Sequence, residues 1–160
     1  MRRGMAGFAL VELLVVLGLG AVLAGGLLWY VRPLADRLAL RTAAARLVGD
    51  LRDAQARALA ERDPSRAHGI EFSAGGRAYV TFVQTGAVRS PTREQRLHPR
   101  VQITHARFGG VPSLVMFTGV SLLGAPSGGG TVTLSAGGAI LCVRVQPATG
   151  RARIDGAGCP

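Results

Sequence analysis

The sequence predicts an α+β protein in which one long N-terminal helix packs on an antiparallel β-sheet. Residues 8–62 form an apolar run followed by apolar residues at spacings of three and four, which is the pattern of one helix face. Residues 68–154 contain short apolar and β-branched segments separated by Gly-rich turns, which is typical of antiparallel strands. The apolar face of such a helix needs a cover, and the strands that follow it can provide one.

The first element is an apolar segment over residues 8–31. Roughly twenty apolar residues are enough for a helix to cross a bilayer. Trp29 and Tyr30 stand at its far end, where aromatic rings favour the membrane interface. Arg2 and Arg3 precede it, and such basic residues keep an N-terminus on the cytoplasmic side. We therefore expect a transmembrane helix over 8–31 and a globular domain over 32–160 outside the membrane.

Glu12 is the single charged residue in this apolar segment. A carboxylate costs about 2.5–3.5 kcal/mol at the centre of a spanning helix and less near its end. In an ordinary signal anchor, Glu12 would reach the nearby cytoplasmic interface. In the alternative interpretation, it pairs with a cation of a neighbouring chain. A cleaved secretory signal is disfavoured, because the small residue Gly7 precedes the apolar run instead of following it.

Residues 7–17, Gly-Phe-Ala-Leu-Val-Glu-Leu-Leu-Val-Val-Leu, resemble the N-terminal signal of type IV prepilins and type II secretion pseudopilins. The resemblance implies a leader of residues 1–7, which a prepilin peptidase removes by cutting after Gly7 before the new N-terminus, Phe8, is methylated. It also implies that Glu12 pairs with the N-terminal ammonium of an adjacent subunit during assembly. The implied partners are the prepilin peptidase, other major and minor pilins or pseudopilins, and the bacterial inner membrane.

The helical pattern continues over residues 34–62 as an amphipathic helix. Pro33, just before it, can kink the helix or mark its exit from the membrane. Asp63 and Pro64 are expected to end it. The apolar face comprises Leu40, Ala44, Leu47, Leu51, Ala54 and Ala58.

Seven strands are expected after this helix. Gly75-Gly76 and Gly137-Gly138 are placed to turn two hairpins. Residues 85–99 are polar and Arg-rich, and we expect an irregular loop there, with a second loop at 127–130. The expected strands are residues 68–73, 77–84, 101–106, 114–117, 131–135, 139–145 and 151–154.

This plan is similar to that of type IV pilins, and its details resemble the GspH/FimT branch of minor pseudopilins. The matching parts are the Arg- and Ala-rich helix at 41–60, the strand Gly69-Ile-Glu-Phe72 and the C-terminal segment 140–153. The resemblance implies a structural subunit of a type IV pilus. Two alternatives remain, a minor pseudopilin H of a type II secretion system that supports protein export, and a membrane-anchored binding domain that never polymerises.

Charge and cysteine content add two expectations. The chain has 19 basic residues, all Arg, and 9 acidic ones, for a net charge of +10, which favours anionic partners such as nucleic acid or a membrane surface. Cys142 and Cys159 lie in the exported part, where an oxidising compartment permits a disulfide. The bridge would close a loop of about 17 residues, worth roughly 3 kcal/mol, and the alternative is two unpaired thiols.

A basic motif lies between the two cysteines. Arg151 and Arg153 would point to the same side of a strand, where two guanidiniums can hold phosphates, and Arg144 lies on the strand leading in. A GRxR motif of this kind, here Gly150, Arg151 and Arg153, resembles that of FimT-like competence pilins, which implies binding of double-stranded DNA for uptake. The alternative is a solvated basic edge strand that prevents sheet-to-sheet pairing.

The residues that carry chemistry do not form a catalytic pattern. His68, His98 and His105 lack partners at metal-ligand spacing. The glycines at 128–130 are not followed by Lys-Ser or Lys-Thr, so they do not form a phosphate loop. We expect a non-enzymatic protein with no metal and no cofactor. It is expected in the inner membrane with a cytoplasmic N-terminus, and in a filament after assembly.

Overall fold

A computed structural model describes residues 6–109, 113–120, 125–156 and 159, without the side chains of 6–10, 24 and 27–30. The chain divides into two compact units, Met1–Ala35 and Asp36–Pro160. Among the described residues, no helix is long and apolar enough to cross a membrane. Several side chains of the predicted transmembrane segment 8–31, and residues 1–5 of the predicted leader 1–7, lie outside this description.

One helix, α1 (Ala6–Glu61), includes Pro33 and ends where the sequence predicts. Arg62 has a φ of 50°, and its N–H donates to the carbonyl of Ala58 at 3.2 Å. Asp63 accepts hydrogen bonds from the backbone and hydroxyl of Ser65, and the hydroxyl bond lowers the pKa of the Asp63 carboxyl below its usual value. This side-chain turn and Pro64 prevent the helix from continuing.

Two four-stranded antiparallel sheets follow the helix. Sheet A has the order β3-β2-β1-β5, and sheet B has the order β4-β6-β7-β8. The strands of sheet A are β1 (Arg66–Phe72), β2 (Ala78–Thr85), β3 (Val88–Arg96) and β5 (Leu114–Thr118). Those of sheet B are β4 (Gln102–Phe108), β6 (Gly130–Ala136), β7 (Ala139–Val145) and β8 (Ala152–Asp155).

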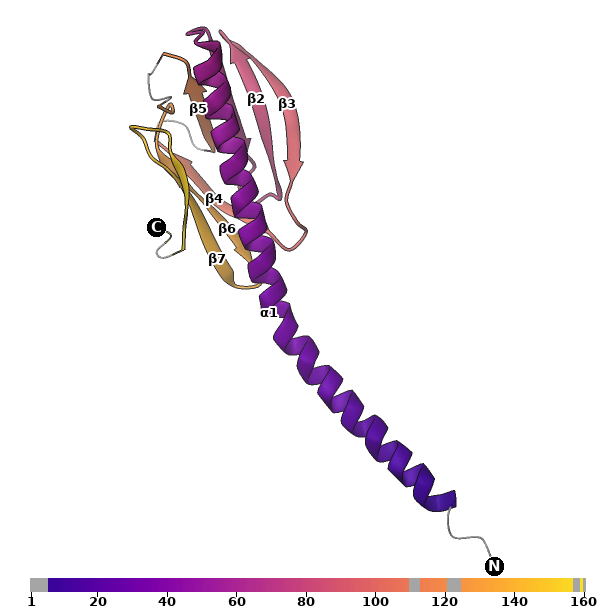
Figure 1. Cartoon of the computed structure of the whole chain (residues 1–160). Coiled ribbons are helices and arrows are strands. Elements are labelled where there is room, and N and C mark those ends of the chain that lie inside the picture. The colour runs from indigo at the N-terminus through magenta and orange to yellow at the C-terminus, as the bar shows by residue number, and fades with distance from the viewer. Residues whose placement is uncertain (1–5, 110–112, 121–124, 157–158, 160) are drawn as a thin grey trace, which may run out of the picture. The chain divides into compact units, whose positions relative to one another are not determined.

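The second half of α1 packs against both sheets, with β2 and β3 on one side and β4, β6 and β7 on the other (Figure 1). All six apolar helix positions expected from the sequence are buried. They meet residues of both sheets in one core, including Ile70, Phe117, Ile103 and Val143, each with no exposed surface. The helix is therefore covered as predicted, although by two sheets instead of one.

The β6–β7 hairpin follows the sequence prediction in detail. Gly137 and Gly138 have φ values of 55° and 83°, and Ala136 pairs with Ala139 across them. Two successive positive φ values are typical of a type I′ turn, which glycine adopts most easily. The Gly75-Gly76 turn likewise joins two antiparallel strands, β1 and β2.

The prediction of an irregular loop over residues 85–99 is wrong, because most of it forms β3. This strand pairs with β2 at the edge of sheet A. Its first seven residues are all exposed, so both faces of the strand are open to solvent there. A two-sided exposed strand lacks the apolar alternation that identifies a strand from sequence. Pro91 lies beside the register shift between Thr81 and Phe82, and an edge strand with a bulge tolerates a proline.

Candidate functional site

The segment between β7 and β8 is a tight turn built around Gly150. Gly150 is buried with a φ of 66°, a left-handed conformation that favours glycine. Its N–H donates to the carbonyl of Gln146 at 2.9 Å, and the N–H of Gln146 donates to the carbonyl of Arg151 at 3.1 Å. The hydroxyl of Thr149 donates to Oε1 of Gln146 at 3.0 Å. The glycine of the GRxR motif thus sets the position of Arg151.

Three arginines lie in one row on the outer face of sheet B, the face turned away from α1. The strand registers pair Arg107 with Thr131, Thr131 with Arg144, and Arg144 with Arg153. The neighbours Val132, Val143 and Ala152 belong to the core, and side chains alternate between the two faces of a sheet, so the row faces outward. Arg107 comes from β4 and was not among the arginines that the sequence indicated.

Asp155 is the sole carboxylate in the four strands of sheet B, and it lies beside this row. Its Oδ2 is 3.6 Å from Nη1 of Arg144 and 3.8 Å from Nη2 of Arg153. Both arginines keep substantial exposure, with 39% and 55% of their side chains accessible. A single negative charge therefore stands against two guanidiniums, and the face keeps a net positive charge.

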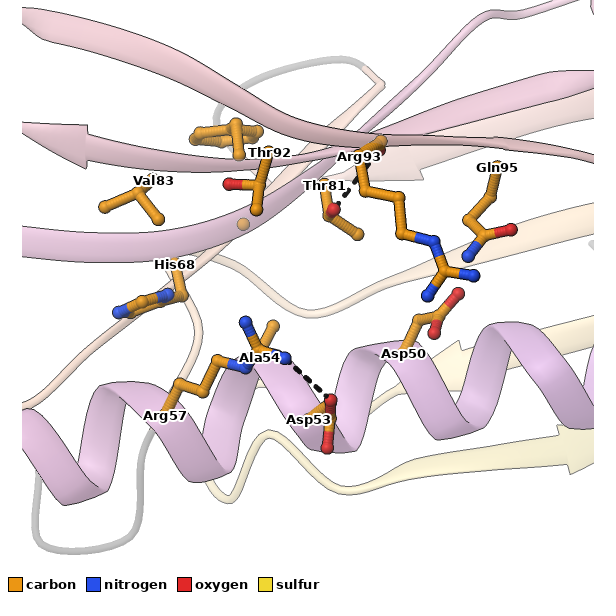
Figure 2. Close-up of a pocket in the computed structure, with 12 residues that line it drawn as sticks. Asp50, Asp53, Ala54, Arg57, His68, Thr81, Val83, Thr92, Arg93 and Gln95 are labelled. Atoms are coloured by element: carbon orange, nitrogen blue, oxygen red, sulfur yellow. Dashed lines mark hydrogen bonds and ion pairs between the residues drawn. The ribbon is translucent and has the colours of Figure 1, made fainter.

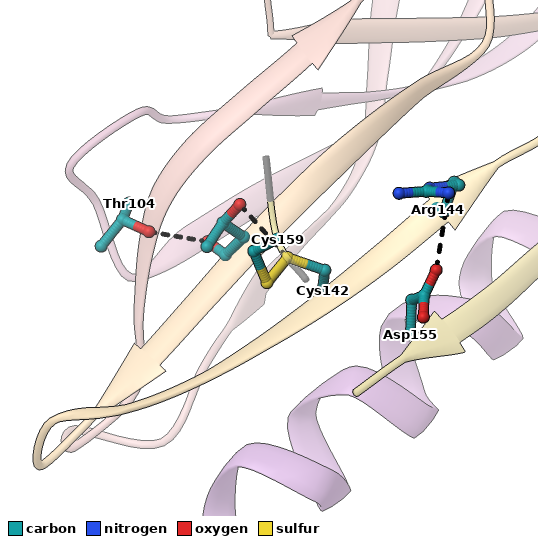
Figure 3. Close-up of a disulfide and its surroundings, with 6 residues drawn as sticks. Thr104, Cys142, Arg144, Asp155 and Cys159 are labelled. Atoms are coloured by element: carbon teal, nitrogen blue, oxygen red, sulfur yellow. Dashed lines mark hydrogen bonds and ion pairs between the residues drawn. A yellow bond between two sulfur atoms is a disulfide. The ribbon is translucent and has the colours of Figure 1, made fainter. Parts of the chain in front are cut away.

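Cys142 and Cys159 form a disulfide on this same outer face, with their Cα atoms 5.7 Å apart (Figure 3). Cys142 pairs with Asp155 in the register of β7 and β8 and is 1% exposed. Its Sγ lies 3.5 Å from the hydroxyl of Thr133 on β6. The disulfide links Cys159, which follows β8, to Cys142 on β7, and Cys142 lies on the same face of the sheet as Arg144.

Arg151 is set apart from Arg144 and Arg153. It precedes β8, is exposed, and lines a groove against α1 together with Arg52. Arg153 does not line that groove and instead faces Asp155. The structure thus divides the GRxR arginines between two surfaces, whereas the sequence suggested a shared one.

The N-terminal candidates lie on α1. The backbone of Gly7 and Phe8 is helical, and the side chain of Phe8 lies outside the described part. The side chain of Glu12 is exposed, as are the surrounding leucines and valines. Glu12 is thus a single carboxylate on an exposed, otherwise apolar helix surface.

A cavity of about 210 Å³ lies between α1 and sheet A (Figure 2). Several of its polar groups already have partners within the fold. The Tyr79 hydroxyl donates to Asp50, and burial together with this bond raises the pKa of Tyr79 above its ordinary value. Asp53 forms an ion pair with Arg57 at 3.2 Å, the i,i+4 arrangement on α1.

His68 also lines this cavity, and its Nε2 lies 3.0 Å from Oε2 of Glu61. Hydrogen bonding with His68 lowers the pKa of the Glu61 carboxyl below its usual value. His98 accepts a bond at Nδ1 from the backbone of Arg100, and His105 lies in the outer face of β4. Over the described ranges, no three His, Cys, Asp or Glu residues gather where they could hold a metal ion.

Comparisons with known proteins address both the N-terminal segment and the fold. Residues 2–28 match the family model described as the prokaryotic N-terminal methylation motif. No curated protein matches the sequence. Two crystal forms of the type IV minor pilin FimU of Pseudomonas aeruginosa are similar in structure at 18% identity. One has a TM-score of 0.52 over 72% of this chain and 91% of the other, and the second has 0.55 over 74% and 90%.

The fold is that of a type IV minor pilin: a long N-terminal helix followed by antiparallel sheets. The chain therefore combines a type IV pilin-like fold with a prokaryotic N-terminal methylation motif.

Proposed function

We propose that this chain is a structural subunit of the GspH/FimT type, matured at Gly7-Phe8 and assembled into a type IV filament. The observation that carries the proposal is the methylation motif at the start of a helix whose second half is the core of a pilin fold. The exposed first part of that helix supplies the apolar surface for packing between subunits. This role implies membrane anchoring before assembly, with the prepilin peptidase and other pilins as partners.

Processing is the direct test of this proposal. Intact-mass and peptide spectrometry of the protein from cells with an active prepilin peptidase should show an N-terminal, methylated Phe8. The same cells without the peptidase should retain residues 1–7. Retention of Met1 in the presence of an active peptidase would refute the proposal.

A second proposed function is binding of duplex DNA by the outer face of sheet B. The observation that favours it is the row Arg107, Arg144 and Arg153, which the single carboxylate Asp155 does not neutralise. Arginine binds phosphate well, and phosphate contacts carry no sequence information. We therefore expect weak binding without sequence preference, which decreases as salt increases.

A mobility-shift or anisotropy measurement with two unrelated duplexes at low salt tests this function. Equal binding to both, with a negative log–log slope against salt concentration, is the expected result. The absence of any shift at low salt would refute DNA binding and favour the alternative role as a secretion pseudopilin.

A further inference from the structure

A groove of about 590 Å³ lies between α1 and the turn that joins β7 to β8. The helix contributes Arg52 and Gln55, and the strand side contributes the other lining residues, Gln146, Thr149, Arg151 and Ala152. All of them belong to the compact unit Asp36–Pro160. The groove is thus a feature of one unit that joins residues from two distant parts of the sequence.

The lining of this groove is suited to an anion. It contains two guanidiniums, two side-chain amides and one hydroxyl, and none of its lining residues is a carboxylate. The cavity beside sheet A differs, since Asp50 and Asp53 are among its lining residues. Guanidinium groups bind phosphate oxygens through paired N–H donors, and hydroxyl and amide groups can complete the coordination.

The two walls of the groove are held together by direct hydrogen bonds. Nη2 of Arg52 donates to the carbonyl of Ala152 at 3.5 Å, and Nε2 of Gln55 donates to the carbonyl of Thr149 at 2.8 Å. The partner of Arg52 is a neutral carbonyl, so its positive charge is retained. Among the described residues, no carboxylate forms an ion pair with Arg52 or Arg151.

We propose that this groove is a phosphate subsite in which Arg52 and Arg151 bind one phosphate of a nucleic-acid backbone from opposite sides. This inference rests on the proposed DNA-binding function and adds Arg52, a helix residue outside the GRxR motif. The bond to the carbonyl of Ala152 positions the guanidinium of Arg52 before the ligand arrives, and the hydrogen bonds of the turn hold the backbone of Arg151 beside it, which reduces the ordering cost of binding.

The test is fluorescence anisotropy with a labelled 30-base-pair duplex and the full-length mature chain in non-ionic detergent, titrated at several salt concentrations. The variants are R52Q, R151Q and the double variant. A further variant, R52K, keeps the positive charge but lacks the planar guanidinium that can donate two hydrogen bonds to one phosphate. The matched control is R41Q, because Arg41 is exposed on the same helix and does not line the groove. Thermal unfolding verifies that each variant is folded.

We expect R52Q and R151Q each to weaken binding several-fold, and the double variant to reduce the salt slope by about one unit, as expected for loss of one phosphate contact. The double variant should lose less than the product of the two single effects, because both arginines hold the same phosphate. R52K should recover part of the loss, and R41Q should remain close to wild type.

Two negative results are distinguishable. If wild type binds and R151Q weakens binding, but R52Q behaves like R41Q, the subsite is refuted and DNA binding stands. If wild type itself fails to bind at low salt, DNA binding is refuted and the subsite with it.

Discussion

Glu12 is an exposed carboxylate on an apolar stretch of α1. Glu12→Val should leave membrane insertion unchanged, because it removes a group that is costly in an apolar span. The variant should no longer co-assemble with partner pilins, since the cation of the neighbouring subunit loses its partner. Membrane fractionation and co-purification measure the two effects separately, with Glu12→Asp as the charge-preserving control. Normal filament incorporation of the Val variant would show that the carboxylate has no role in assembly.

Gly69 lies buried in the central strand β1, between β2 and β5. A Cβ at this position would lie 2.6 Å from the carbonyl oxygen of Val115 and would also overlap the Phe82 ring. Gly69→Ala should therefore lower the free energy of unfolding by about 1–3 kcal/mol, the usual range for overpacking.

Chemical denaturation measures this effect of Gly69→Ala. Gly49→Ala is a control, because Gly49 is exposed on α1 with open space around it, and alanine favours a helix by up to about 1 kcal/mol. Equal stability of Gly69→Ala and wild type would contradict the close packing of β1 between its neighbours.

The disulfide connects an element, β7, with the tail that follows β8. It spans a sequence separation of 17 residues, for which the chain-entropy model gives roughly 3 kcal/mol. Cys159→Ser should lower stability by about this amount, and reduction of wild type should have the same effect because it removes the same link. Denaturation with and without a reducing agent measures both. A variant that remains as stable as oxidised wild type would show that β8 is held by pairing alone.

Two elements show the limits of sequence patterns. The helix face was predicted because its apolar residues repeat within a few positions of one another. Strand β3 was missed, because an exposed edge strand has no buried face to produce an alternation. Its pairing with β2 comes from backbone hydrogen bonds, which are insensitive to side-chain type.

Over the whole chain, basic residues outnumber acidic ones by 19 to 9, and three of the arginines, Arg107, Arg144 and Arg153, form the row on the outer face of sheet B. Asp155→Asn releases Arg144 and Arg153 and should strengthen DNA binding, whereas Arg107→Gln should weaken it and reduce the salt slope by about one unit. Asp53→Asn is the matched control for net charge, because Asp53 is exposed on α1 and pairs with Arg57.

Anisotropy titrations at fixed salt measure these opposite effects. We expect Asp155→Asn to bind DNA most tightly, Asp53→Asn to bind with an affinity near that of wild type, and Arg107→Gln to bind most weakly. If Asp155→Asn and Asp53→Asn were equally effective, net charge alone would explain the binding, and the arginine row would have no specific role.

Local sequence patterns were sufficient to predict the methylation motif with Gly7, Phe8 and Glu12, the buried face of α1 and the two Gly-Gly hairpin turns. Each of these signals lies within a few neighbouring residues, so local spacing is enough to identify it.

The arginines that lie near one another became visible in the folded chain alone. Arg107 lies in one row with Arg144 and Arg153 through the register of β4, β6, β7 and β8. Arg52 and Arg151 line the same groove because α1 packs on the β7–β8 turn. The same packing separates Arg151 from Arg153, although they are two positions apart in the sequence. The reason is physical: strand register and helix docking are set by the burial of the whole core, and no short-range pattern records that choice.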